Sequence, residues 1–388
     1  MDIQQIRQQC KATSKLVHFN NAGAALSPDA VTSAVLDYLR LEQRVGGYEA
    51  AHTKATELGA FYTSMAELLH CQPDEIAFVE NATRAWDQAI YAVQWQAGDE
   101  ILTGEMEYAS NYMGLLHLQK QTGIKIRLIP SDDQGQIDLA RLSAAITPRS
   151  RMIALTHIAS QCGDIQPAEE VGRIAQEYGL YFLLDACQST GQLDLDVNAL
   201  HCDFLCGTGR KYLRGPRGTG FLYVRASKLP DLQPIFVDLH AAKWTAANSY
   251  ELQANASQFE NFERFVAGQL GLAVAVDYAL QIGLESITER IQLLVNKTVS
   301  ALDDLPDIKI HERSMQRSGI ITLSRQQEPA SALHARLAGA GINTSIVKAA
   351  NTRLDTQING QQDRLRASLH YYNSGEEIER FVRVLGAH

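Results

Sequence analysis

Polar residues that can do chemistry follow three apolar runs of the sequence. Asp185 comes directly after the run YFLL, Lys211 comes shortly after the run FLC, and residues 81–83 follow the run IAFVE. In a parallel α/β sheet, ligands collect outside the carboxyl ends of the strands. If these runs are parallel strands, an acid, a lysine and a polar helix start meet at one edge of a sheet.

The three features together match the needs of one kind of cofactor. A lysine amine can condense with an aldehyde, and a carboxylate such as Asp185 can keep a pyridine nitrogen protonated. Free N–H groups at the start of a helix, here near Ala82 and Thr83, can bind a phosphate. Each feature alone is common on protein surfaces and in helix caps, but the combination indicates pyridoxal phosphate.

The spacing of the apolar runs predicts the elements that position these residues. Strand-like runs begin near residues 76, 100, 125, 151, 181, 204 and 219. Most of the gaps can hold a crossover helix, such as the one expected after Pro167. Alternating units of this size predict a mostly parallel α/β sheet between helices. The last gap holds only the turn that contains Gly215 and Pro216, so the seventh strand is expected to be antiparallel.

The pattern changes near residue 268. A long apolar helix begins there and is followed by further helices, by short strands such as residues 318–323, and by a last strand and helix after Leu365. We therefore predict an N-terminal arm over residues 1–19, a large α/β domain over residues 20–267 and a smaller α+β domain over residues 268–388.

Six ordered motifs resemble the class V aminotransferase group of fold-type I pyridoxal-phosphate enzymes. That group includes cysteine desulfurases, selenocysteine lyase, kynureninase and isopenicillin N epimerase. The resemblance covers nearly the whole chain. Its motifs are HFNNAG at residues 18–23, NAT at 81–83, EYASN at 107–111, DACQ at 185–188, TGRK at 208–211 and RASLHYYN at 366–373.

The resemblance implies roles for the residues around the cofactor ring. Lys211 matches the lysine that binds the cofactor covalently, and Asp185 matches the acid that pairs with the ring nitrogen. Gln188 matches a hydrogen-bond donor to the phenolic oxygen. Tyr108 falls where relatives place a ring that stacks on the cofactor, and an aromatic face suits that contact. Lys211, Asp185 and Tyr108 are therefore the predicted catalytic residues.

Further positions match phosphate and substrate contacts. The expected phosphate-binding residues are Ala82, Thr83, Thr208 and Arg210. Arg210 departs from the histidine that desulfurases usually carry before the lysine, although an arginine can bind a phosphate through two hydrogen bonds.

Arg366 matches the arginine that binds the substrate α-carboxylate. Asn20, Asn21, Ser160 and Gln161 are its expected neighbours in the substrate site.

The reaction type depends on what leaves after the Cα proton. Persulfide-type desulfurases of this group use a cysteine in the small domain, but the matching residues 341–351 contain none, and Cys206 is the last cysteine of the chain. The sequence therefore favours a lyase that cleaves a C–S bond in a cysteine-derived amino acid and disfavours persulfide-type desulfuration. An amino-acid epimerase, with Tyr108 or a histidine as second proton donor, and an aminotransferase remain alternatives.

Composition limits the other function classes. The 388 residues carry a formal net charge of −9, which argues against binding nucleic acid. No apolar stretch approaches the ~20 residues of a membrane helix, and the N-terminus does not resemble a secretory signal. We therefore expect a cytoplasmic protein with no membrane or nucleic-acid partner.

The cysteine spacing and the glycine-rich segment bear on other cofactors. The six cysteines lack metal-ligand spacing, so we expect free thiols and no metal. The GPRGTG segment at residues 215–220 precedes a strand instead of following one, which disfavours a nucleotide-binding oxidoreductase. A scaffold without a cofactor is also disfavoured.

The resemblance implies a homodimer in which the partner often contacts the phosphate. The corresponding loop is replaced here by residues 258–264, so no ligand from the partner is predicted.

Overall fold

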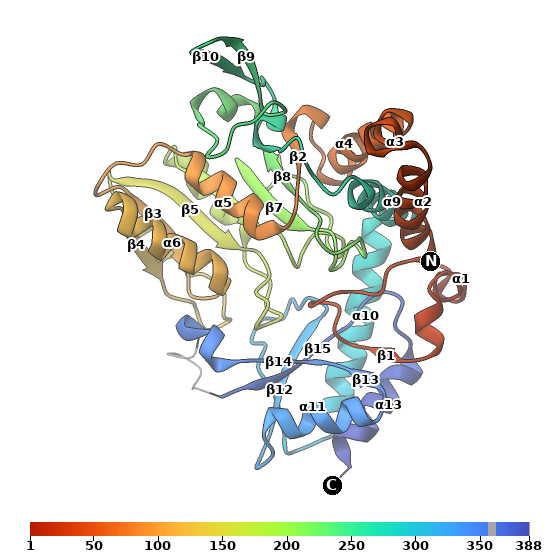
Figure 1. The fold of residues 1–388 in the computed structure, drawn as a ribbon. Helices are drawn as coiled ribbons and strands as arrows, with labels where there is room; N and C mark the ends of the chain where they lie inside the picture. Colours follow the sequence, from red (N-terminus) through yellow and green to blue (C-terminus); the bar gives the residue numbers. More distant parts are fainter. Residues whose placement is uncertain (356–361, 388) are drawn as a thin grey trace.

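A computed structural model describes residues 1–355 and 362–387 of the chain. Its main feature is a seven-stranded sheet with the strand order β2-β8-β7-β6-β5-β3-β4 (Figure 1). β8 runs antiparallel to both of its neighbours, and the other neighbouring strands run parallel to each other. The strands are β2 (Ile76–Val79), β3 (Glu100–Gly104), β4 (Lys125–Ile129), β5 (Ser150–Thr156), β6 (Tyr181–Asp185), β7 (Phe204–Thr208) and β8 (Gly220–Val224). The expected mixed, mostly parallel sheet with an antiparallel last strand is confirmed.

Helices cover both faces of this sheet because alternate side chains of each strand point to opposite sides. On β6, Phe182 and Leu184 join one core while Leu183 joins the other. One face packs against α5 (Ala82–Ala92) and α6 (Ala109–Thr122), and the other packs against α7 (Leu139–Ala145) and α8 (Ala168–Glu177). The sheet edge that carries the polar residues therefore lies between two apolar layers.

Four helices pack against one another near β2. They are α2 (Asp29–Val45), α3 (Gly47–Thr53), α4 (Ala55–Leu69) and α9 (Val266–Ile282), of which α4 contacts that strand. α9 packs against α2 and α4, and it meets α10 (Leu284–Asp303) at a bend of 79°. The predicted boundary at residue 268 therefore lies inside a helix that packs on the large sheet's side, and the division into domains stays a prediction.

A second, four-stranded sheet forms the smaller unit below the large one in Figure 1, with the order β11-β12-β15-β14. Its strands are β11 (Ile308–Ile310), β12 (Ile320–Arg325), β14 (Ser345–Val347) and β15 (Arg364–Ser368). The helices α10 and α11 (Ala330–Gly339) pack against this sheet, and α13 (Gly375–Gly386) packs against both helices.

The N-terminal segment crosses to this second unit. After α1 (Ile3–Gln8), strand β1 (Val17–His18) pairs with β13 (Ile342–Asn343). A separate hairpin, β9 (Ala242–Ala246) and β10 (Ser249–Leu252), stands out from the large unit at the top of Figure 1.

Within the described part of the chain, no single helix is both long and apolar enough to cross a membrane. α9 and α10 reach that length and composition only together, across their bend.

Two helical glycines, Gly172 in α8 and Gly59 in α4, are expected to respond in opposite ways to substitution by alanine, because only Gly172 is closely packed. A Cβ added at Gly172 in α8 would lie 2.0 Å from the carbonyl oxygen of Leu200, whereas a Cβ at Gly59 in α4 would meet nothing within 4 Å. Gly172→Ala is expected to lower the free energy of unfolding by about 1–3 kcal/mol through overpacking. Gly59→Ala is expected to raise it by about 0.5–1 kcal/mol because alanine favours the helix. Urea unfolding of both variants measures the difference, and equal effects would contradict the packing argument.

Candidate active site

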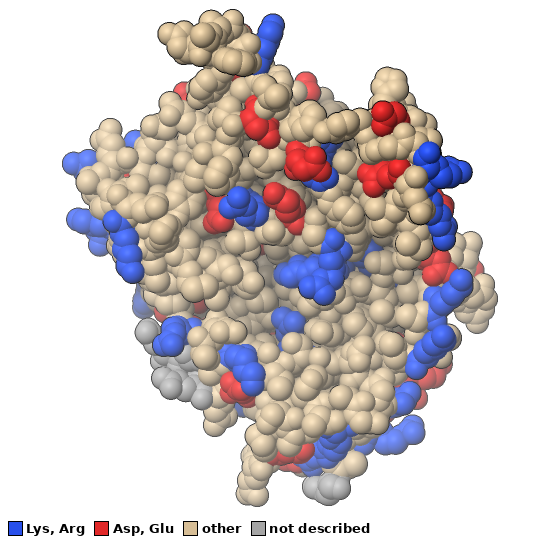
Figure 2. All heavy atoms as spheres, viewed as in Figure 1, with Lys and Arg blue, Asp and Glu red and all other residues tan. Residues whose placement is uncertain are grey.

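A cavity of about 290 Å³ opens at the carboxyl edge of the large sheet. On the face of the molecule drawn in Figure 2, Lys and Arg side chains gather near the middle, between the large and the small sheet. Nine of the predicted site residues line the cavity: Ala82, Thr83, Tyr108, Ser160, Asp185, Gln188, Thr208, Arg210 and Lys211. The fold therefore brings together residues that lie far apart in the sequence.

The carboxylate of Asp185 is fixed by two hydrogen bonds at the end of β6. Its Oδ1 accepts from the main-chain N–H of Cys187 at 2.9 Å, and its Oδ2 accepts from Asn111 Nδ2 at 2.7 Å. The side chain is buried, with 3% of its surface exposed. Charge on a buried carboxylate needs such donors. Asp185 is therefore held in one orientation at the wall of the cavity.

Lys211 lies in a tight turn after β7. The main-chain N–H of Arg214 donates to the Lys211 carbonyl at 2.9 Å, and that of Gly215 donates to the Gly209 carbonyl at 2.7 Å. Only 7% of the lysine is exposed, and burial lowers the pKa of its amine. A lysine with a lowered pKa provides more of the neutral amine that attacks a carbonyl.

A cradle for an anion lies beside Lys211. Asn81 caps α5 by accepting from the main-chain N–H of Arg84 at 3.0 Å, so Ala82 and Thr83 occupy the first turn of the helix, where N–H groups have no partner inside the helix. Arg210 contacts the Thr208 hydroxyl at 3.4 Å, and both residues line the same cavity. N–H groups, hydroxyls and a guanidinium are the groups that bind phosphate.

Gln188 and Tyr108 complete the cavity wall. Gln188 Nε2 donates one hydrogen to the Ala22 carbonyl at 3.2 Å, and its buried Oε1 has no partner among the described residues. Its second amide hydrogen and its oxygen are thus available to a polar group in the cavity. Tyr108 sits at the N-cap of α6. The lining therefore fits a phosphorylated pyridine aldehyde, with Lys211, Asp185, Gln188, Tyr108 and the anion cradle around it.

Arg366 adjoins the cavity from β15 of the second sheet. Its Nη1 donates to the Ser160 carbonyl at 2.8 Å, and its Nη2 contacts Asn20 Oδ1 at 3.4 Å. Burial, and to a smaller extent the charge of Arg210, lower the pKa of its guanidinium. Among the described residues no carboxylate forms an ion pair with this partly buried guanidinium, so it is suited to an anionic ligand.

Asn21 and Gln161 do not line the cavity. The amide of Asn21 donates to the carbonyls of His18 and Ser368, at 3.1 and 2.7 Å, and accepts from the hydroxyl of Tyr372. The amide of Asn21 is therefore used within the N-terminal segment and in joining that segment to β15 and to the turn after it. Gln161 accepts from the Ser160 hydroxyl at 3.3 Å. Their expected contact with substrate stays a prediction.

Sequence reasoning assigned no role to several residues at this site. Asn111, Thr156, Cys187 and Arg217 line the cavity, and Glu107 lies behind it in contact with Asn111. The signal for Glu107 and Asn111 was present in the EYASN motif, since residues four apart at a helix start lie on one face. In the part of the chain that the structure describes, no group of three or more His, Cys, Asp or Glu side chains could hold a metal ion.

Comparisons with known proteins agree with this geometry. The family described as Aminotransferase class-V matches residues 17–381. A "Probable cysteine desulfurase" of Pyrococcus abyssi is 28% identical, over 98% of this chain and 96% of that protein.

Solved structures are also similar. The apo structure of a cysteine desulfurase from Thermococcus onnurineus NA1 has a TM-score of 0.92 and 26% identity, over 99% of this chain and 97% of that one. The cystine C-S lyase C-DES, in complex with its product cysteine persulfide, has a TM-score of 0.89 over 97% of this chain and 99% of that one, and at 22% identity it shows a shared fold.

These matches bear on four of the sequence-based predictions. The fold, the assignment as an enzyme and the cofactor class are confirmed, but the relatives' names do not support the expectation that persulfide-type desulfuration is disfavoured. The residues of the cavity fit pyridoxal phosphate, and the family match extends over nearly the whole sequence. The chain therefore belongs to the aminotransferase class-V family and is a pyridoxal-phosphate-dependent enzyme.

Proposed function

We propose that the protein is a lyase that cleaves the C–S bond of cysteine or of a cysteine-derived amino acid. The observation that carries this proposal is the pairing, in one cavity, of the buried amine of Lys211 with the fixed carboxylate of Asp185. The substrate class rests on the relatives, which are named cysteine desulfurases.

The site residues divide the work of such a reaction. Pyridoxal phosphate, when bound, supplies a protonated ring that accepts the electrons of a bond broken at Cα. Asp185 would keep the ring nitrogen protonated, and Gln188 would donate to the phenolic oxygen. Arg366 would bind the α-carboxylate and so fix which bond of Cα faces the ring. Ala82, Thr83, Thr208 and Arg210 would hold the phosphate.

Lys211 would act as the base for the Cα proton. Its amine is buried, and a lowered pKa brings the neutral form closer to physiological pH. Loss of the β-sulfur group needs no protein nucleophile: a cysteine thioether and water give the free thiol, pyruvate and ammonium.

Cysteine desulfuration through a persulfide is the second candidate, and the names of the relatives favour it. Such a reaction needs a thiol that accepts sulfur at the site. Cys187 lines the cavity, but burial raises the pKa of its thiol to about 12. A thiol of that pKa is mostly protonated at neutral pH and is a poor nucleophile. An external thiol would then be the acceptor.

We further propose that two copies of the chain associate through the surface around the β9–β10 hairpin. Leu239 and Trp244 are 76% and 67% exposed there, and large exposed apolar side chains close together are typical of an interface. The neighbouring apolar side chains are Ile235, Phe236, Val237 and Tyr250.

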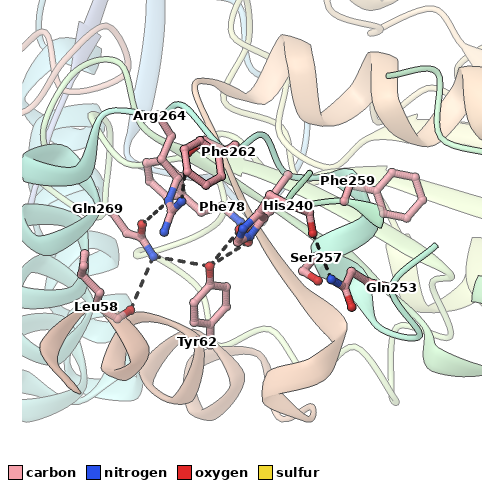
Figure 3. A network of polar contacts seen from close by, with 12 residues as sticks. Leu58, Tyr62, Phe78, His240, Gln253, Ser257, Phe259, Phe262, Arg264 and Gln269 are labelled. Carbon is pink, nitrogen blue, oxygen red and sulfur yellow. Dashed lines mark hydrogen bonds and ion pairs between the residues drawn. The ribbon is translucent and has the colours of Figure 1, made fainter. Parts of the chain in front are cut away.

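A buried polar network around Glu260 connects the chain on either side of the β9–β10 hairpin to the body of the protein (Figure 3). Glu260 accepts from the Tyr62 hydroxyl and from His240 Nε2, each at 2.9 Å, and from the Phe78 main-chain N–H at 2.7 Å. Beyond it, Phe262 is exposed and packs edge-on against Tyr48, with ring centroids 6.3 Å apart. The network thus presents apolar side chains on a rigid base, which lowers the entropic cost of association.

The reaction is tested with cofactor-loaded protein and a panel of L-cysteine, cysteine thioethers and their sulfoxides. We expect pyruvate and thiol in equal amounts from at least one of them, and no pyruvate from the Lys211→Ala variant. Alanine together with sulfane sulfur would instead establish desulfuration. Deuterium entering Cα with the side chain retained would support an epimerase, and an aminated cofactor would support an aminotransferase; either result contradicts the lyase.

The burial of Lys211 predicts how stability depends on pH in the cofactor-free protein. In the folded protein the pKa of the amine lies below its ordinary value of 10.5. Below the folded pKa the protein must therefore bury a charged amine, which lowers the free energy of unfolding. Lys211→Met is therefore expected to raise the free energy of unfolding. The gain is largest below the folded pKa and shrinks as pH rises toward 10.5. Urea unfolding at several pH values measures it, and a gain that grows with pH would refute the assignment of the cause to burial.

The association is tested by light scattering across a dilution series. We expect the wild-type chain to have twice the mass of one chain and the double variant Leu239→Asp/Trp244→Asp to dissociate at higher concentration, because two charges would be buried. Met315→Asp is the control, since Met315 is also an exposed apolar residue but lies in the small unit. A monomeric wild-type protein, or equal dissociation of both variants, counts against this surface.

A further inference from the structure

A single amide nitrogen joins two buried carboxylates behind the cavity. Asn111 Nδ2 donates to Asp185 Oδ2 at 2.7 Å and to Glu107 Oε1 at 2.9 Å. All three side chains are almost fully buried. Since one NH₂ group carries two hydrogens, both are used, and the position of Asp185 depends on that of Glu107.

Every hydrogen-bond partner of Glu107 can donate. Its Oε1 accepts from the main-chain N–H of Tyr108 at 2.9 Å, from Asn111 and from the hydroxyl of Thr156, and its Oε2 accepts from the Thr103 hydroxyl at 3.0 Å. Donors from the ends of β3 and β5 and from the start of α6 thus converge on this carboxylate. These hydrogen bonds favour the charged form of Glu107 and oppose the effect of its burial, which raises the pKa of the carboxyl.

We infer that Glu107 is a positioning residue that, through Asn111, fixes Asp185 and adds negative charge behind it, so that the cofactor's ring nitrogen stays protonated. This inference rests on the proposed use of pyridoxal phosphate but not on the reaction type. Glu107 also fixes the main chain of Tyr108, so the same carboxylate sets both the aromatic wall and the acid of the site.

The other titratable groups around Asp185 do not replace this charge. Cys187 and Cys206 face Asp185, but burial raises the pKa of both thiols, to about 12 for Cys187, so they are uncharged at neutral pH. The amine of Lys211 also faces Asp185, and burial lowers its pKa. Burial also raises the pKa of Glu107, and repulsion by Asp185 adds to that effect while the hydrogen bonds of Thr156 and Asn111 oppose it.

The amide isostere separates charge from shape at this position. In Glu107→Gln the amide oxygen can keep the three donors of Oε1, and the amide NH₂ can donate to the Thr103 hydroxyl in place of Oε2. The substitution therefore removes one negative charge and preserves the hydrogen bonds. Loss of a negative charge near a protonated nitrogen lowers the proton affinity of that nitrogen.

The test is ¹⁵N NMR of protein loaded with pyridoxal phosphate labelled at the ring nitrogen, recorded over a series of pH values. In Glu107→Gln we expect the chemical shift to move toward that of unprotonated pyridine. The pH at which the nitrogen loses its proton is expected to fall by about one unit, a tenfold loss of proton affinity. A change in shape alone would not produce this signature.

Glu105→Gln is the matched control. Glu105 lies two residues away and accepts from the main-chain N–H of Ser131 at 2.7 Å. Its substitution removes the same charge from the protein but leaves the hydrogen bonds of Glu107, Asn111 and Asp185 in place. We expect its spectra to match the wild type. Identical spectra for Glu107→Gln and wild type at every pH, or equal shifts in both variants, would overturn the inference.

Two further results keep the test decisive. If Glu107→Gln does not fold, Thr103→Val removes one donor to Glu107 and is expected to shift the titration in the same direction, and an unchanged titration would overturn the inference. A wild-type protein that gives no signal of bound cofactor would contradict the proposed function itself, which is a different outcome from identical spectra.

Discussion

The burial of two opposite charges at one sheet edge is the constraint on which the rest of the site depends. Asp185 and Lys211 both lie almost out of contact with water. Burying a charge is costly unless hydrogen bonds or an opposite charge compensate it. The fold meets this cost with N–H donors for the carboxylate and with a lowered pKa for the amine.

That constraint explains why so many elements end at the same place. Asp185 needs a donor from α6, and α6 starts where β3 ends. The donor, Asn111, is itself held by Glu107, which draws hydrogen bonds from Thr103 on β3 and Thr156 on β5. Three neighbouring parallel strands therefore share one polar network. The second sheet joins the same site through a hydrogen bond from the Arg366 side chain to the carbonyl of Ser160, which links the two sheets at the cavity.

The sequence predicted the large sheet because its strands are continuous apolar runs at regular spacing, a pattern that only buried parallel strands need. It also pointed to Asp185, which directly follows such a run, and to Lys211, which comes shortly after one. It did not predict the network behind them. Glu107 and Asn111 stand in a helix start like many surface residues, and only the three-dimensional register of β3, β5 and β6 brings them to Asp185. For Asn21 the motif predicted a contact with substrate. In the structure its amide instead donates to main-chain carbonyls that hold the N-terminal segment in place.

The charge of the cavity differs in sign from that of the whole chain. The protein carries a net charge of −9, yet three cations (Lys211, Arg210 and Arg217) line the cavity with two carboxylates (Glu80 and Asp185), and Arg366 adjoins it. The charges of Arg210 and Arg366 each lower the pKa of Lys211, so the three cations repel one another. Anions that enter, such as a phosphate and an α-carboxylate, relieve that repulsion. The free site is thus in a state that bound anions stabilise, so recognition of phosphate and carboxylate follows from the placement of these cations around the cavity.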